Sequence, residues 1–187
     1  METLTERHVD GGIAGFSFAA ELDWLRGQAR RHYNIAEIGA WKGRCTEALA
    51  SSTGGHVTVV DAWAGTTDTT DEIAHLDGEQ AFQEYLANIG GYRNVTTYRA
   101  PSHEAWRRLH FESFDMVWID ADHRYEAVRE DILMWGSLLR PGGLLCGHDG
   151  QYADVSRAVS ELVPNAKRFE TPQPGWDEPS VIWYSGA

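Results

Sequence analysis

The stretch IAEIGAWKGRCTEALA, residues 35–50, decides the fold class of this chain. It opens with apolar and β-branched residues typical of a buried strand, breaks at Gly39 and Gly43, and continues with residues that favour a helix. A strand, a tight glycine turn and a helix in succession open a parallel α/β unit. The acid Glu37 and the aromatic Trp41 stand beside these glycines, so the turn also predicts a binding site.

The same alternation of strands and helices continues along the chain. Two segments that flank a loop rich in proline and glycine predict an antiparallel pair at the sheet edge. The predicted strands are residues 33–39, 56–63, 94–100, 114–121, 142–149, 166–174 and 180–187, and the predicted helices are residues 15–32, 43–51, 78–88, 102–109, 125–139 and 153–162. We therefore expect an α/β fold, a three-layer Rossmann-like sandwich with a mostly parallel seven-stranded sheet and an antiparallel C-terminal hairpin.

Length and composition predict one domain. The chain has 187 residues, of which 42% are hydrophobic and 24% charged, as in an ordinary globular domain. We expect a single domain over residues 1–187, with an N-terminal helical segment (1–32), a core that carries the site (33–150), and a helix with the closing hairpin (151–187). Cys45 and Cys146 lack CxxC spacing and are expected to be small buried residues rather than metal ligands.

The charge balance narrows the range of partners. A net charge of -12 disfavours binding to a phosphate backbone or to an anionic membrane surface. We expect neither nucleic acid nor a membrane as partner, and a neutral or cationic small molecule or a divalent cation fits better. The N-terminus has no basic segment followed by an apolar run, so a cytoplasmic location is expected. Nothing in the sequence favours or excludes a homodimer.

A first site is predicted at the glycine turn. Parallel α/β sheets bind ligands at the carboxyl ends of their strands. Glu37 lies near the end of the first strand, Gly39 lets a ligand approach the backbone, and Gly43 opens the next helix. The spacing is ExGxxxG rather than the GxGxxG of a dinucleotide site, and an acid repels phosphate. Asp61, 24 residues after Glu37, can accept both hydroxyls of a ribose. A ribose that carries a positive group describes S-adenosylmethionine.

These residues resemble motif I and the ribose-binding acid of the class I S-adenosylmethionine-dependent methyltransferases. Residues 60–65, 81–106 and 114–149 are similar in order and spacing to the methyltransferase domain 24 family, so the resemblance covers roughly residues 33–150. It implies S-adenosyl-L-methionine as cofactor, with its adenine near Ala100 and Ser102. The cofactor-binding residues that it implies are Glu37, Gly39, Ala40, Trp41, Gly43, Asp61, Ala62, Ala100, Ser102 and Asp120.

A second site is predicted where the fourth and fifth strands end. Asp120 and His123 follow the fourth strand, and His148 and Asp149 follow the fifth, so neighbouring parallel strands bring them to one crevice. Like charges gathered in this way destabilise one another, and a divalent cation offsets that cost. The alternative is that His123 and Asp149 cap helices, that Asp122 is a turn residue, and that His148 donates to a carboxylate.

The pattern also resembles metal-dependent sugar and small-molecule O-methyltransferases, in which a histidine three residues after the first acid acts as base. The resemblance implies Asp120 and His123 as catalytic residues, and Asp120, His148 and Asp149 as metal ligands. Histidine is a poor ligand for magnesium and a better one for manganese, iron or zinc, so a divalent metal such as Mg or Mn stays open.

The sequence thus predicts an enzyme that methylates a hydroxyl of a small-molecule acceptor such as a sugar, with a metal and His123 activating that hydroxyl. A non-catalytic nucleoside-binding module and a metal-free N-methyltransferase are the alternatives. Trp41, Trp63 and Trp176 are candidates to stack on a sugar ring, while Trp106, Trp118, Trp135 and Trp183 are expected in the core. The long loop Ala64–Asp77, with Asp68, Asp71 and His75, is either a lid or a solvated loop.

Overall fold

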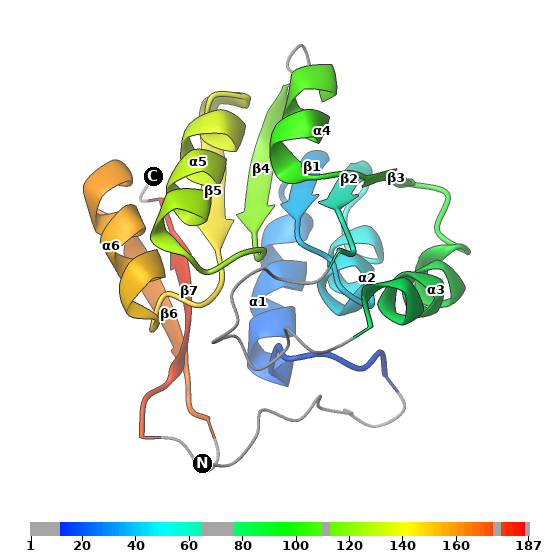
Figure 1. Ribbon diagram of the computed structural model, residues 1–187, viewed down its shortest axis with the longest axis horizontal. Helices are drawn as coiled ribbons and strands as arrows, with labels where there is room; N and C mark the ends of the chain where they lie inside the picture. The colour runs from blue at the N-terminus through cyan, green and yellow to red at the C-terminus, as the bar shows by residue number, and fades with distance from the viewer. Residues whose placement is uncertain (1–11, 65–76, 110–112, 174–176, 186–187) are drawn as a thin grey trace.

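The computed structural model describes residues 12–64, 77–109, 113–173 and 177–185 as a sheet between two layers of helices (Figure 1). The strands are β1 Asn34–Ile38, β2 His56–Asp61, β3 Val95–Arg99, β4 Phe114–Ile119, β5 Leu139–Gly147, β6 Lys167–Thr171 and β7 Ser180–Tyr184. The helices are α1 Ala19–Ala29, α2 Arg44–Ala50, α3 Gly78–Ile89, α4 Ser102–Leu109, α5 Tyr125–Gly136 and α6 Ala153–Leu162. The predicted α/β sandwich with seven strands is confirmed.

The sheet has the strand order β3-β2-β1-β4-β5-β7-β6. Strands β1 to β5 are parallel, and β7 runs antiparallel to both β5 and β6, which confirms the predicted C-terminal hairpin. The order reverses between β1 and β4, and this switch point opens a crevice at the carboxyl ends of the strands.

Two hydrophobic cores hold the layers to the sheet. Side chains of α1, α2 and α3 pack on one face, and those of α4, α5 and α6 pack on the other (Figure 1). The central strands are buried on both sides, which explains why their sequences are nearly continuous apolar runs. Both cysteines are free and buried, as predicted. None of the helices in the described part of the chain has the length and apolar content that a membrane crossing requires.

Gly39 brings the glycine turn against the tip of β4. The register pairs Ile38 with Ile119, and the Asp120 N–H donates to the Ile38 carbonyl at 2.7 Å. Gly39 has a φ of 88°, and a Cβ there would lie 1.9 Å from the Asp120 carbonyl oxygen. No other residue fits this position, so the first predicted site and the second share one backbone contact.

The helix predicted over residues 15–32 begins only at Ala19. Residues 12–18 instead cross α2, where the Arg44 guanidinium donates to the Ile13 carbonyl at 3.1 Å and a Cβ at Gly15 would lie 2.9 Å from Arg44 Cδ. The Phe18 N–H donates to the Glu21 carboxylate at 2.7 Å and starts the helix there.

The long helix predicted to end at residue 139 ends at Gly136, so that part of the prediction is wrong. Strand β5 starts at Leu139, before the proline and the glycines, because Leu139 pairs with Phe114 and the Phe114 N–H donates to the Leu138 carbonyl at 2.9 Å. Strand pairing outweighed the local helix signal.

Candidate active site

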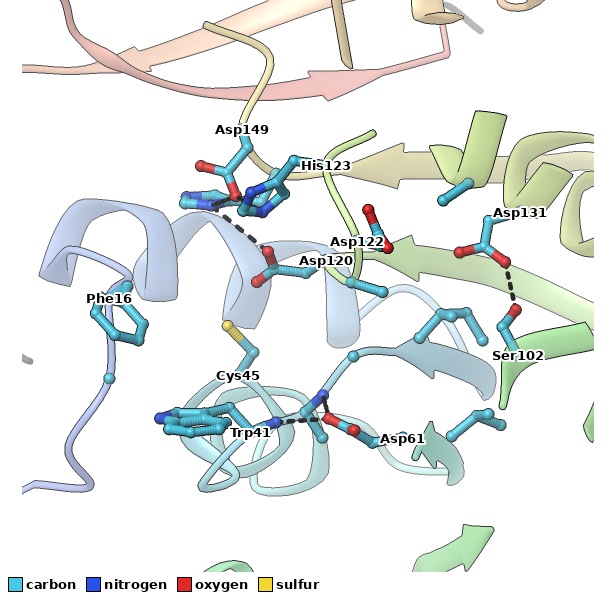
Figure 2. Close-up of a pocket in the computed structure, with 18 of the residues that line it drawn as sticks. Phe16, Trp41, Cys45, Asp61, Ser102, Asp120, Asp122, His123, Asp131 and Asp149 are labelled. Carbon is cyan, nitrogen blue, oxygen red and sulfur yellow. Dashed lines mark hydrogen bonds and ion pairs between the residues drawn. The ribbon is translucent and has the colours of Figure 1, made fainter. Parts of the chain in front are cut away.

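A cavity of about 590 Å³ lies at the carboxyl ends of the parallel strands (Figure 2). This volume suits a small molecule of the size of a nucleoside cofactor. Most of the predicted cofactor residues line the cavity, whereas Glu37, Gly43 and Ala100 lie outside its lining. The predicted cofactor residues that line it are Gly39, Ala40, Trp41, Asp61, Ala62, Ser102 and Asp120.

Asp61 fastens the two turns that form one wall of the cavity. One carboxylate oxygen accepts hydrogen bonds from the N–H groups of Ala40 and Trp41 at 2.8 and 2.9 Å (Figure 2). The other accepts from the N–H of Trp63 at 2.7 Å. A carboxylate has about four acceptor positions, so three amides leave capacity for a ribose hydroxyl. Asp61 can therefore accept one ribose hydroxyl, whereas the sequence predicted that it accepts both.

Glu37 lies beneath the turn and is fully buried. Burial raises the pKa of its carboxyl to about 8, against the opposing effect of Thr46. The carboxyl is therefore mostly neutral at pH 7, so it does not repel phosphate by charge as the sequence predicted. Gly43 also serves the fold, since a Cβ at its φ of 89° would lie 2.6 Å from Ile89 Cγ1.

Asp120, His123 and Asp149 form a compact group at the opposite wall (Figure 2). Each offers one ligand atom, and these atoms lie within 4.8 Å of one another. His123 Nε2 is 2.9 Å from Asp149 Oδ2. Burial raises the pKa of Asp120 to about 6, although the neighbouring histidines oppose this effect. Two carboxylates and an imidazole are a donor set that fits a divalent cation.

His148 lies beside this group but contacts carboxylates through both ring nitrogens. Its Nδ1 is 3.2 Å from Asp149 Oδ2, and its Nε2 is 3.1 Å from Glu21 Oε1. Burial alone would lower the pKa of His148, but Asp149, Asp120 and Glu21 raise it well above its usual value. A protonated ring has no lone pair for a metal. Among the described residues, therefore, the metal-ligand geometry includes His123 in place of the predicted His148.

Glu21 is a residue that the sequence analysis missed. It is fully buried on α1, and although burial opposes this, His148 lowers the pKa of its carboxyl. One signal was available, because Glu21, Leu25 and Ala29 recur at the spacing of one helix face. A charged residue in an apolar stripe calls for a buried partner.

The neighbouring polar residues have structural contacts. Asp122 accepts the N–H of Arg124 at 2.9 Å and pairs with its guanidinium at 2.6 Å, so it is a turn residue. Neither His123 nor Asp149 caps a helix, since the N-cap residues of α5 and α6 are Arg124 and Tyr152.

Several tryptophans have a structural role rather than a role in ligand binding. Trp63 is 4% exposed and donates to the Trp41 carbonyl at 2.7 Å, so its ring is not a free stacking surface. Trp118, Trp135 and Trp183 are in the core, as predicted, whereas Trp106 is only partly buried and packs against the core. Trp176 and the loop residues Asp68, Asp71 and His75 lie outside the described residues.

A second missed residue, Asp131, contacts the predicted adenine side of the cavity. The Ser102 hydroxyl donates to Asp131 Oδ1, and the Trp135 indole N–H donates to the same hydroxyl at 2.7 Å. Asp131 lines the cavity from α5 and is 6% exposed. Burial raises the pKa of its carboxyl to about 7.

Comparison with known proteins agrees with this fold. The model of a family described as a methyltransferase domain, Methyltransf_24, matches residues 36–150. The chain belongs to this family, and it is a class I S-adenosylmethionine-dependent methyltransferase. No curated protein matches the sequence.

Solved structures of methyltransferases share the fold at low sequence identity. An O-methyltransferase from Bacillus cereus in complex with SAH superposes with a TM-score of 0.68 at 17% identity, over 90% of this chain and 81% of that one. Cofactor-bound Rv0187 from MTB gives 0.65 at 20% identity, over 89% and 80%. The N-methyltransferase NodS from Bradyrhizobium japonicum gives 0.58 at 18%, over 88% and 91%. Relatives with this fold thus include both O- and N-methyltransferases.

Proposed function

We propose that this methyltransferase transfers the methyl group of S-adenosylmethionine to a hydroxyl of a sugar or of another hydroxylated small molecule. His123 is the base, and Asp120 and Asp149 hold a divalent cation. The observation that carries the proposal is the contact of 2.9 Å between His123 Nε2 and Asp149 Oδ2 beside Asp120 in the cavity wall.

The chemistry requires a deprotonated hydroxyl in line with the sulfonium methyl group. In this proposal His123 is not a ligand of the cation. It takes the hydroxyl proton on Nδ1, because Nε2 faces Asp149, which orients the ring and stabilises the imidazolium that forms. A divalent cation held by Asp120 and Asp149 would lower the pKa of an acceptor hydroxyl beside it. His148 is assigned to hold Asp149 in place rather than to bind the cation, because its nitrogens contact Asp149 and Glu21.

The cofactor lies along the opposite wall in this proposal. Asp61 receives the ribose, the turn at Ala40 and Trp41 covers it, and the adenine lies near Ser102. The one remaining acceptor position of Asp61 and the exclusion of any side chain at Gly39 support this orientation.

The acceptor enters beside two aromatic side chains. Phe16 and Tyr152 both line the cavity, and the Tyr152 ring centroid is 5.2 Å from that of His123. Flat apolar rings stack well on a sugar ring. The net charge of -12 supports a small neutral acceptor rather than a nucleic acid.

An acceptor screen tests the proposal. The purified protein is mixed with S-adenosylmethionine and a panel of sugars, phenols and amines, and release of S-adenosylhomocysteine is measured. Each reaction is repeated after chelation and after re-addition of Mg²⁺ or Mn²⁺. We expect turnover with hydroxylated acceptors that falls on chelation and returns with one of the two ions. Turnover with amines alone, or turnover insensitive to chelation, contradicts the proposal.

A further inference from the structure

We propose that Asp131 accepts a hydrogen bond from the exocyclic amino group of the cofactor's adenine. This contact would make the site bind adenosine more tightly than its deaminated counterpart. Ser102 and Trp135 orient the Asp131 side chain for this contact. The inference rests on the proposed position of the adenine beside Ser102.

The direction of each hydrogen bond follows from the donors. The Trp135 indole N–H can only donate, so Ser102 Oγ accepts from it at 2.7 Å. The single hydroxyl proton of Ser102 is then directed to Asp131 Oδ1. This chain of two hydrogen bonds determines which carboxylate oxygen faces Ser102 and which one is left over.

The other oxygen, Oδ2, is available for a ligand. Figure 2 shows it turned away from Ser102, with both residues on the side of the pocket opposite Phe16. Within the described part of the chain, the bond to Ser102 is the one hydrogen bond of the Asp131 carboxylate. Asp131 is 6% exposed and lines the cavity, so Oδ2 has the cavity as its route to a donor.

Adenine supplies such a donor. Its amino group donates two hydrogen bonds, whereas the deaminated base carries a carbonyl oxygen at that position and would face Asp131 Oδ2 acceptor to acceptor. A ligand without a donor at this position binds more weakly, because the buried acceptor oxygen of Asp131 is then left without a hydrogen bond.

The same chain of donors predicts the behaviour of Asp131→Asn. Ser102 still requires an acceptor, so the amide oxygen of the new side chain turns toward Ser102. Its NH₂ group then faces the cavity, where it repels an amino group and pairs with a carbonyl oxygen.

Titration calorimetry with two ligands tests this prediction. The ligands are S-adenosylhomocysteine and its analogue with oxygen in place of the 6-amino group. At about pH 8.5, above the Asp131 pKa of about 7, we expect the wild-type protein to bind the amino ligand roughly 10- to 100-fold more tightly, as for a hydrogen bond to a charged group. Asp131→Asn should abolish or invert this preference. Adding Ser102→Ala to Asp131→Asn should remove the inversion, because the amide is then free to rotate.

The control is Glu126→Gln, which replaces an exposed glutamate on α5 that does not line the cavity. It should keep the wild-type preference. Equal affinity of the wild-type protein for the two ligands, or an unchanged preference in Asp131→Asn, overturns the role of Asp131. The wild-type comparison does not depend on how well any variant folds.

This test is separable from that of the proposed function. A protein that distinguishes the two ligands yet methylates no hydroxyl supports the role of Asp131 and contradicts O-methylation. A protein that methylates hydroxyls without distinguishing the ligands gives the opposite result.

Discussion

At the scale of single residues, the site depends on groups whose charge is set by burial. His123 is the side chain on which the proposed chemistry depends. Replacing it with alanine should lower kcat by about 10²- to 10⁴-fold, the usual contribution of a general base. The affinity for S-adenosylhomocysteine should stay unchanged, because His123 lies in the wall opposite Asp61. Stopped assays for kcat and calorimetry for affinity measure the two effects.

His56→Ala is the matched control for this substitution. His56 begins β2, at the end of the strand away from the cavity, and contacts Thr96 Oγ1 at 2.9 Å. Its removal should leave kcat near the wild-type value. Equal losses in the two variants would mean that His123 acts on folding and not as a base.

Glu37 gives a prediction for stability against pH. Its folded pKa of about 8 lies above its unfolded value, so the folded state holds a proton that the unfolded state releases as pH rises past about 4.5. The cost to stability is absent below that pH and grows until about pH 8. Glu37→Gln keeps the neutral shape without the cost. It should match the wild-type free energy of unfolding at pH 4 and exceed it at pH 8 by roughly 3 to 5 kcal/mol.

Urea denaturation at the two pH values measures this difference. Glutamine has nearly the same shape as glutamate, so the contact with Thr46, whose effect opposes the pKa shift, is kept. A constant offset between the two proteins at all pH values would contradict a buried, protonated Glu37.

At the scale of elements, the contact between the β1 turn and the tip of β4 makes the site rigid. Gly39→Ala would place a Cβ 1.9 Å from the Asp120 carbonyl oxygen at a φ of 88°. We expect it to lower the free energy of unfolding by about 3 kcal/mol or more. Gly27→Ala on α1 is the control, because nothing lies within 4 Å of a Cβ there. It should stabilise by about 0.5 to 1 kcal/mol. Thermal denaturation of both variants measures the change in stability. Equal changes in the two variants would contradict the close approach of Gly39 to the Asp120 carbonyl.

Elements whose signal is local could be predicted from the sequence, and elements set by distant contacts could not. The central strands are apolar runs because they are buried on both faces, so β1, β2 and β4 were predicted closely. The start of α1 was missed because it depends on Arg44, which lies on another element. Asp131 was missed because a single acid on a helix has the same pattern as a solvated residue. Its role depends on Ser102, which reaches it only in the folded chain.

At the scale of the whole molecule, cofactor binding should stabilise the fold. A ligand that binds only the native state at about 100 times its Kd adds about 2.7 kcal/mol to the free energy of unfolding. For a chain of this length, S-adenosylhomocysteine should raise Tm by roughly 5 to 10 °C. NADH is the control and should leave Tm unchanged, since the GxGxxG spacing is missing. A shift with NADH and none with S-adenosylhomocysteine would contradict the cofactor assignment.

The contacts of His148 have a consequence for where this domain begins and ends. The family similarity spans residues 36–150, but the imidazole is held by Glu21 from the N-terminal side and by the Ser180 hydroxyl at 3.2 Å from the C-terminal side. A fragment trimmed to the similar region would keep the buried cation and lose two of its partners. The smallest fragment that can fold alone must therefore include both Glu21 and Ser180, which keep the buried charge of His148 paired. This fragment is longer than the region of family similarity.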